Sequence, residues 1–380
     1  MIIISITIIL AYLFLIAMLI YGFDKVSYFT LEDMPSKTKF SVVIPFRNEV
    51  ENLPILLSSI KNLNYPKHLF EIILINDDSE DDSVKTIKKI IDTKTPHNDF
   101  SGIDIKIINN KRLTNSPKKD AITTAIKQSK YKWIISTDAD CILPKYWLDS
   151  FDEYIQKTNA ICIVAPVIYN VTDSFLNRFQ LLDILSLQGA TIGGFGIKKP
   201  FLCNGANFGY KKQLFNDLKG FDGNNNIASG DDIFLLEKAT KTYPEKVHYL
   251  KSKKAVVKTE SQPSWASLIS QRVRWAAKTT AYNYIGKTMG IIVLLTNILI
   301  LITLLLSILG LYNFKIWLYI LIIKFSIDFY LIYKSTVFFN EQRILKSYFL
   351  GFFIYPFFSV YVALTSIFSN YAWKGRPFKK

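Results

Sequence analysis

The chain has 380 residues, half of them hydrophobic, and its 46 Lys and Arg residues against 31 Asp and Glu residues give a formal net charge of +15. No nucleic-acid recognition motif accompanies this charge, so the expected partners are an anionic membrane surface and phosphorylated substrates, and nucleic acid is not one. The three cysteines and three histidines show no metal-ligand spacing, which disfavours a zinc site and a disulfide framework and suits a reducing compartment.

An almost uncharged run opens the chain at residues 2–21 and is long enough to cross a bilayer, which takes about 20 residues. A cleaved signal peptide is the alternative, but no basic segment precedes the run and no small-residue cleavage site follows it. We therefore expect a membrane anchor over residues 1–22. Basic residues follow the run from Lys25 onwards and none precedes it, so the positive-inside rule predicts that the next domain is cytoplasmic.

Residues 36–285 are mixed in character and long enough for one domain with a sizeable core. Strands are expected at 40–44, 71–75, 103–108 and 132–137, and helices at 50–62, 83–91 and 118–129. This alternation predicts an α/β fold with a mostly parallel sheet and helices on both faces. Neither GxGxxG nor GxxxxGK[ST] occurs, which disfavours the usual dinucleotide fold and a phosphate-binding P-loop.

Asp138-Ala139-Asp140 is the most informative motif, because it follows a predicted buried strand. Residues two apart on a strand face the same way, and neighbouring carboxylates repel each other unless a cation lies between them. Mg²⁺ and Mn²⁺ suit such ligands and often bridge to phosphate, and ligands collect at the carboxyl ends of parallel strands. The motif therefore indicates a metal–diphosphate site, with a solvated acidic loop as the alternative.

Three further apolar runs, at 288–311, 316–333 and 347–369, follow the central domain and predict transmembrane or interfacial helices over 288–370. A basic tail, 371–380, ends the chain and is expected to be cytoplasmic. Four full spans from an outside N-terminus would place that tail outside. One apolar segment is therefore a candidate for a re-entrant or interfacial helix, and the segment interrupted by Pro356 is the first of these.

Seven motifs follow one another along the chain. They lie at 43–49, 76–79, Lys119, 138–140, 204–208, 230–232 and 271–275. In order and rough spacing they resemble family 2 glycosyltransferases, and the last, Gln-x-x-Arg-Trp, is similar to the membrane-bound branch that holds cellulose, chitin and hyaluronan synthases. This resemblance implies a GT-A-like catalytic domain with N-terminal and C-terminal transmembrane helices.

The resemblance also implies a role for each site residue. It implies that Asp232 is the catalytic base. The implied contacts to the donor nucleotide are Pro45, Arg47, Glu49, Asp77, Asp78, Lys119 and Asp138. The implied ligands of Mg²⁺ or Mn²⁺ are Asp140 and Asp138. The implied contacts to the acceptor or the diphosphate are Asn204, Asp231, Gln271, Arg274 and Trp275.

Several of these residues have a structural alternative. The acids of the 76–79 motif could lie at a helix N-terminus, which favours negative charge, and Lys119 could be a solvated lysine. The acids of the 230–232 motif could cap a helix, and Trp275 could anchor the chain at the membrane interface. The glycines in 193–196 indicate either a mobile segment or a plain turn.

The expected function is that of an inverting glycosyltransferase in the inner (plasma) membrane, multi-pass, with its catalytic domain in the cytoplasm. It would move a sugar from a nucleotide-sugar, a UDP-sugar, to a lipid-linked or growing saccharide acceptor. A processive polysaccharide synthase with a partner subunit and a transferase for ceramide-like lipids are the enzyme alternatives. A nucleotide-sugar sensor and a transporter are the other classes. Transport is disfavoured because only the third apolar run of the first three holds ionisable residues, Lys324 and Asp328.

Overall fold

The computed structural model divides into two compact units. It describes residues 1–380 except 94–99, 226, 228, 280–281, 369–370, 374–375 and 379–380. The sheet unit comprises Ser27–Asn170 and Cys203–Glu260, and the helical unit comprises Met1–Val26, Val171–Leu202 and Ser261–Lys380. The predicted catalytic domain was continuous over 36–285, whereas residues 171–202 and 261–285 fall in the helical unit.

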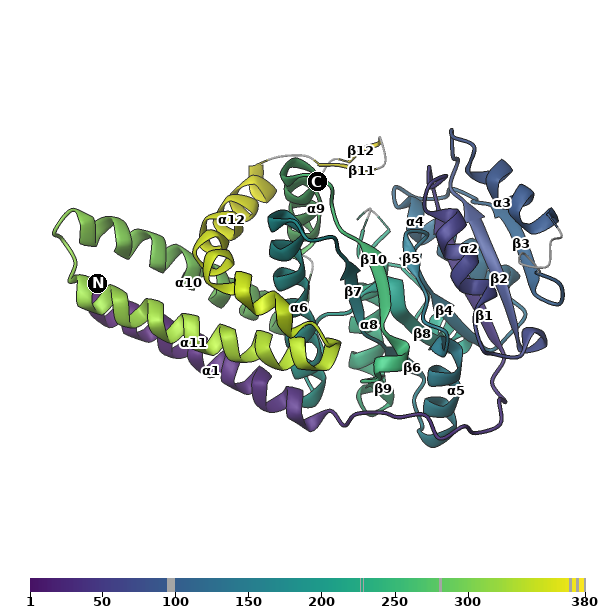
Figure 1. Cartoon of the computed structure of the whole chain (residues 1–380), viewed down its shortest axis with the longest axis horizontal. Helices are drawn as coiled ribbons and strands as arrows, with labels where there is room; N and C mark the ends of the chain where they lie inside the picture. Colours follow the sequence, from purple (N-terminus) through teal and green to yellow (C-terminus); the bar gives the residue numbers. More distant parts are fainter. Residues whose placement is uncertain are drawn as a thin grey trace. The chain divides into compact units, whose positions relative to one another are not determined.

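The first half of the sheet unit alternates strands with helices, as the hydrophobic pattern predicts. Its strands are β1 (Phe40–Phe46), β2 (Phe70–Asn76), β3 (Asp104–Asn109) and β4 (Trp133–Ser136), and its helices are α2 (Leu53–Lys61), α3 (Ser83–Asp92) and α4 (Pro117–Gln128). β1 pairs in parallel with β2 and β4, and β2 pairs in parallel with β3. The carboxyl ends of these four strands therefore point to one edge of the sheet (Figure 1).

The second half extends the same sheet to seven strands, in the order β3-β2-β1-β4-β8-β6-β9. The added strands are β8 (Phe208–Lys211), β6 (Cys162–Val164) and β9 (Val247–Tyr249), and the helices beside them are α5 (Trp147–Lys157), α7 (Lys212–Asp217) and α8 (Asp231–Thr242). β8 runs antiparallel to both β4 and β6, and β6 is parallel to β9. A small sheet of β5 (Cys141–Ile142), β10 (Val257–Glu260) and β7 (Val167–Asn170) completes the unit. The predicted mostly parallel α/β fold is confirmed.

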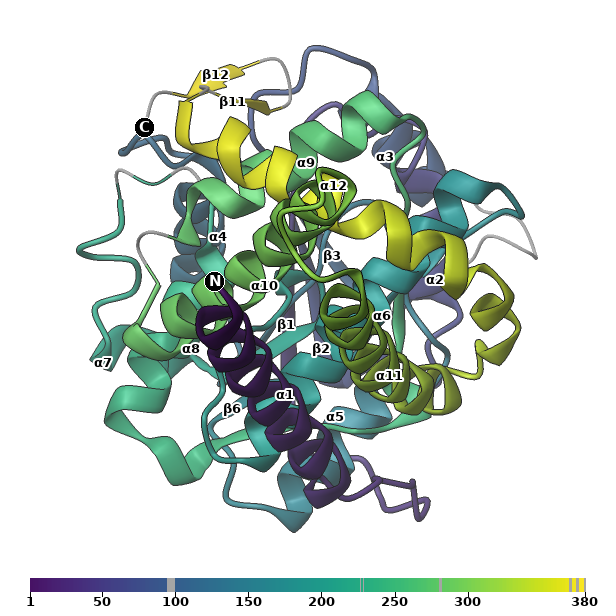
Figure 2. The same ribbon diagram turned by 90° about the vertical axis from the view of Figure 1, so that its left-hand side faces the viewer.

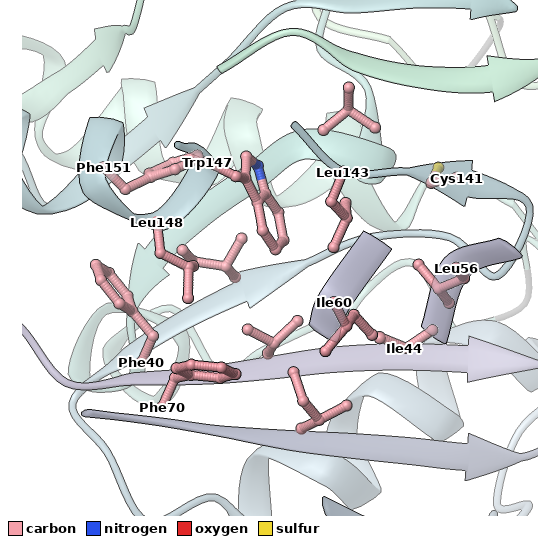
Figure 3. Packing of buried hydrophobic residues seen from close by; sticks show 14 of the residues in the cluster. Phe40, Ile44, Leu56, Ile60, Phe70, Cys141, Leu143, Trp147, Leu148 and Phe151 are labelled. Carbon is pink, nitrogen blue, oxygen red and sulfur yellow. The ribbon is translucent and has the colours of Figure 1, made fainter. Parts of the chain in front are cut away.

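The core of the sheet unit lies between the central strands and the helices that cover them (Figure 3). Phe40 and Ile44 of β1, Leu56 of α2 and Trp147 of α5 are fully buried in it. Successive residues of β1 and β2 are buried without alternation, as expected for parallel strands covered on both faces. The indole N–H of Trp147 donates to Asn207 Oδ1 at 2.9 Å, so the core also fixes the segment that enters β8.

Among the residues that the structure describes, the helical unit has four helices long and apolar enough to cross a membrane, which confirms the four predicted apolar runs as helices. Its helices are α1 (Ile2–Lys25), α6 (Phe175–Gly196), α9 (Trp265–Ala277), α10 (Tyr284–Ile308), α11 (Phe314–Phe339) and α12 (Tyr348–Phe368). Pro356 lies inside α12, and the tail forms a short hairpin of β11 (Tyr371–Trp373) and β12 (Arg376–Phe378). The side of the membrane on which the tail lies stays a prediction.

Lys324 and Asp328, in the middle of α11, neutralise each other. The Lys324 ammonium lies 2.5 Å from Asp328 Oδ2, and the Tyr12 hydroxyl of α1 donates to Asp328 Oδ1 at 2.5 Å. Buried charge inside an apolar helix bundle is costly unless it is paired and hydrogen-bonded. The pair therefore joins α11 to α1, which Figures 1 and 2 show side by side.

The glycines near residue 195 belong to a tight helix crossing. They form the end of α6, so the expectation of a plain turn is wrong, and that of a mobile segment stays a prediction. A side chain on Gly193 would meet the carbonyl oxygen of Leu19, and one on Gly196 would meet the carbonyl oxygen of Gly22. Small residues let helix backbones approach each other closely in membranes, so these glycines dock α1 on α6.

Replacing Gly193 should weaken this crossing. Gly193→Val forces its new side chain into the α1 backbone, and we expect the free energy of unfolding to fall by about 1–3 kcal/mol. Gly290→Val is the matched control, because nothing lies within 4 Å of a Cβ built at Gly290. Thermal unfolding of the full chain in detergent measures both variants, and equal losses would contradict the docking role.

Candidate active site

Carboxylates from two segments of the sheet unit meet at one lysine. Asp138 follows β4 and Asp231 begins α8, while Lys118 lies in the first turn of α4. The Lys118 ammonium lies 2.8 Å from Asp138 Oδ1 and 3.4 Å from Asp231 Oδ2. We call Lys118, Asp138, Asp231 and Asp232 the acidic cluster.

The ammonium of Lys118 stays charged in this setting. Burial alone lowers the pKa of Lys118, but the carboxylates of Asp138, Asp231 and Asp232 outweigh the burial and raise that pKa above its ordinary value. A positive charge among three acids removes the repulsion that would otherwise separate them. Lys118 therefore holds the end of β4 and the start of α8 together.

Asp232 is oriented by backbone groups. Its Oδ2 accepts the N–H of Gly205 at 2.9 Å, and its Oδ1 accepts the N–H of Ile233 at 2.8 Å. A Cβ at Gly205 would lie 3.1 Å from Asp231 Oδ2, so the close approach of this segment favours glycine. Gly230, with φ of 86°, is the helix cap, and both acids lie in the first turn of α8, where the helix dipole favours negative charge.

Lys119 makes contacts of a different kind from those of Lys118. Its side chain is buried, and its ammonium donates to the carbonyl oxygens of Asn224 at 2.7 Å and Ile227 at 2.8 Å. The alternative of a solvated lysine is therefore wrong. Lys119 holds the segment that leads to the 230–232 motif, and the predicted contact of Lys119 with the nucleotide stays a prediction.

The two acids after β2 differ in their surroundings. Asp77 is 4% exposed, and its Oδ1 accepts the Asn110 amide at 2.7 Å. The same amide nitrogen donates to the carbonyl oxygen of Pro117 at 3.0 Å, which fixes the orientation of the Asn110 side chain. Asn110 Oδ1 is buried and has no hydrogen-bond donor among the described residues. The Asp78 side chain, in contrast, is 77% exposed.

Arg47 stabilises the loop after β2 by hydrogen bonds. Its guanidinium donates to the carbonyl oxygens of Asp77 and Asp78 and to Glu80 Oε1 at 2.7 Å, and it lies 3.6 Å from the Asp78 carboxylate. Glu49 is buried, and its Oε2 accepts the side-chain amide of Asn52 at 2.7 Å.

Pro45 is the last but one residue of β1, which pairs with β2. These contacts set the shape of the edge where β1 and β2 end, and any direct contact of Pro45, Arg47 and Glu49 with a nucleotide stays a prediction.

The 204–208 motif forms the turn before β8. Asn204 caps a short 3₁₀ helix, Gly205–Asn207, by accepting the N–H of Ala206 at 3.0 Å. Asn207 is fully buried and donates to the carbonyl oxygens of Pro166 and Ala255 at 2.8 and 2.7 Å. Asn207 is therefore a structural residue, whereas Asn204 lies next to the Gly205 N–H that orients Asp232.

The Gln-x-x-Arg-Trp motif lies on α9 of the helical unit. Gln271, Arg274 and Trp275 are half-buried there. Their predicted roles toward the acceptor or the diphosphate stay predictions.

Comparisons with known proteins identify the family of the chain. The sequence profile of Glycosyl transferase family 2 matches residues 41–219, and that of Glycosyl transferase family group 2 matches residues 133–334, more than half of the chain. The chain belongs to glycosyltransferase family 2. It is therefore a glycosyltransferase, as its motifs predict.

Curated relatives in this family are named poly-beta-1,6-N-acetyl-D-glucosamine synthase. One from Staphylococcus epidermidis is 27% identical over 244 residues, which cover 62% of this chain and 53% of the relative. One from Staphylococcus aureus is 33% identical over 146 residues, which cover 37% of this chain and 32% of the relative. The chain thus spans about half or less of the length of these relatives.

A solved structure shares the fold over nearly the whole chain. The mannosyltransferase PcManGT from Pyrobaculum calidifontis, in complex with GDP-Man and Mn²⁺, has a TM-score of 0.56 and 12% identity, and the match covers 96% of this chain and 98% of that one. At this identity the likeness supports the family 2 fold alone.

The acids of this family 2 chain fit a divalent cation held partly by its substrate. No group of three or more His, Cys, Asp or Glu side chains in the described part of the chain could hold a metal ion by itself. Mg²⁺ commonly takes one or two carboxylates and completes its shell with phosphate and water. Asp138 and Asp140 are both partly exposed and suit that arrangement.

Sequence reasoning missed Lys118 and Asn110. The family motif predicted Lys119 as the site lysine, whereas its neighbour Lys118 contacts the acids. Asn110 directly follows β3, and a polar side chain at the carboxyl end of a parallel strand was the available signal.

Removing the Lys118 charge should destabilise the protein without metal. Lys118→Met leaves three neighbouring acids without their ammonium, and we expect the free energy of unfolding to fall by about 1–3 kcal/mol. Mn²⁺ should restore more stability to this variant than to the wild type, because the cation replaces the missing charge. The exposed Lys85→Met, which removes an ion pair with Asp82, is the control. Thermal unfolding with and without Mn²⁺ gives the answer, and an equal Mn²⁺ effect in all three proteins would contradict it.

Proposed function

We propose that this glycosyltransferase is an inverting enzyme that moves a sugar from a UDP-sugar to a lipid-linked or growing saccharide acceptor at the membrane. The observation that carries the proposal is the acidic cluster, in which Lys118 joins Asp138 to the two acids that begin α8. Such a cluster can bind a metal that neutralises the diphosphate of a donor, and it can also supply a catalytic base.

The donor is proposed to lie along the carboxyl ends of β1, β2 and β4. Asp77 is the better candidate for the nucleoside acid, because it is buried beside Asn110 whereas Asp78 is exposed. An acceptor-only carboxylate suits a uracil N–H or a ribose hydroxyl. The unpartnered Asn110 Oδ1 supports a ligand that brings a further N–H or O–H donor to this place.

Asp138 and Asp140 are proposed to hold Mg²⁺ or Mn²⁺ on the diphosphate. The cation, when bound, neutralises the charge that develops on the leaving nucleoside diphosphate. Lys118 already contacts Asp138, so its ammonium can also reach an oxygen of that leaving group. Binding of GDP-Man and Mn²⁺ by PcManGT, which shares the fold, agrees with a nucleotide-sugar and a cation here.

Asp232 is proposed to be the base. It takes the proton of the acceptor hydroxyl as the oxygen attacks the anomeric carbon from the side opposite the diphosphate, which departs with its bonding electrons. One such displacement inverts the anomeric centre. The N–H groups of Gly205 and Ile233 hold the Asp232 carboxylate in one orientation, which is what a positioned base requires.

The helical unit is proposed to serve the acceptor. Gln271, Arg274 and Trp275 on α9 carry the motif that resembles membrane-bound synthases, and Arg or Trp suits a diphosphate or a sugar ring. The four candidate spans support a multi-pass protein of the inner (plasma) membrane, with the sheet unit proposed to face the cytoplasm.

Processive synthesis of a polysaccharide is the second candidate. It is favoured by the curated relatives, which are named as synthases of a poly-N-acetylglucosamine. Because the matches cover only about half or less of those proteins, neither their polymer nor a partner subunit follows for this chain.

Asp232→Asn tests the base. We expect sugar transfer to fall by about 10²–10⁴-fold, because a positioned base contributes that much, while nucleotide binding is retained. Purified membranes incubated with UDP-sugars and Mn²⁺ report the released nucleotide, and a chelator of divalent cations should abolish the wild-type signal. Asp217→Asn, at an exposed acid of α7, is the control. Unchanged release by Asp232→Asn would remove the proposed mechanism.

The nucleoside site is tested by comparing the two acids after β2. Asp77→Asn should weaken the binding of UDP with Mn²⁺ by about tenfold or more, because a hydrogen bond to a buried charge is lost. Asp78→Asn should bind as the wild type does. Calorimetry on the full chain in detergent measures both, and the opposite ranking would assign the nucleoside to Asp78.

A further inference from the structure

One face of α6 presents three polar side chains to the segment that leads into α9. Asn177, Gln180 and Asp183 are spaced three residues apart, so they share that face. Asn177 Oδ1 accepts the Ser261 hydroxyl at 3.1 Å. Gln180 is fully buried and exchanges two hydrogen bonds with the Gln262 backbone, at 2.9 and 2.8 Å.

Asp183 holds the buried arginine inside the Gln-x-x-Arg-Trp motif. Its Oδ2 accepts both Nε and Nη2 of Arg272 at 2.7 Å, and the two side chains are 5% and 7% exposed. The remaining nitrogen of the Arg272 guanidinium, Nη1, donates to Gln271 Oε1. The guanidinium also lies over the Trp275 ring, 4.2 Å from its centre. Arg272 thus contacts two of the three motif side chains.

We propose that Asp183 is a positioning residue for the acceptor or diphosphate group that the motif binds. It fixes the Arg272 guanidinium, and the guanidinium fixes Gln271 by a hydrogen bond and Trp275 by stacking. This inference rests on the proposed function of Gln271 and Trp275. A planar guanidinium has donors in a rigid fork and a face that stacks on indole, so one group can set both side chains.

The ion pair of Asp183 and Arg272 contributes more to the position of its neighbours than to the stability of the protein. Taking two charges out of water costs about as much as their attraction returns, and well-packed apolar residues often replace such a pair without loss. Stability alone would therefore not require Asp183 and Arg272 at the helix contact. A fixed orientation for Gln271 and Trp275 does require them, because misplacing a contact by about 1 Å can lower a rate about 10²-fold.

Two variants of the full chain, in detergent or nanodiscs, separate these roles. Asp183→Asn should lower sugar transfer by about 10- to 100-fold, because kcat falls and the KM for the acceptor rises. The double variant Asp183→Leu/Arg272→Met should recover the thermal stability that the single variant loses, yet transfer should stay low. Asp173→Asn, which removes the ion pair of Asp173 with Arg178 next to α6, is the control and should transfer sugar normally.

The outcomes decide between the roles. Recovery of transfer together with stability in the double variant would show that the pair is only structural, and normal transfer by Asp183→Asn would overturn the inference outright. Gln271→Ala and Trp275→Ala are measured beside them. If these two lose transfer while Asp183→Asn keeps it, only the role of Asp183 fails. If these two keep transfer, the proposed function of the motif fails and the inference about Asp183 fails with it.

Discussion

Repulsion among three carboxylates is the constraint on which the sheet unit depends. Asp138 follows β4, while Asp231 and Asp232 begin α8, and without a cation their repulsion would destabilise this arrangement. The Lys118 ammonium supplies that cation within the chain itself. A second cation carried with a diphosphate would suit the same acids, so the forces that hold this edge of the sheet together are those that a nucleotide-sugar site needs.

Adjacent residues serve different purposes around this cluster. Lys118 and Lys119 are neighbours on α4, and neighbours on a helix do not face the same way, so one contacts the acids and the other contacts the loop before α8. In the same way, Asp77 is buried and Asp78 is exposed to solvent. The two members of each pair thus have different surroundings, while the roles predicted for all four residues toward the nucleotide stay predictions.

Much of the fold could be predicted from the sequence, because buried parallel strands and amphipathic helices leave strong local patterns. The four apolar helices and the strands before the 76–79 and 138–140 motifs are of this kind. Contacts between distant segments left no such pattern. Arg272 meets Asp183 across 89 residues, and the glycines of α6 meet α1, so neither role could be inferred from local composition. The choice between Lys118 and Lys119 likewise required the direction of each side chain.

The proposed function requires that Asp138 and Asp140 bind a cation that also coordinates the donor diphosphate. Electron–nuclear double resonance on Mn²⁺, bound to the full chain with UDP, tests it most directly. We expect phosphorus couplings from the diphosphate, together with loss of bound Mn²⁺ in Asp140→Asn. Mn²⁺ that shows only water in its shell, or that binds equally well in Asp140→Asn, would contradict it.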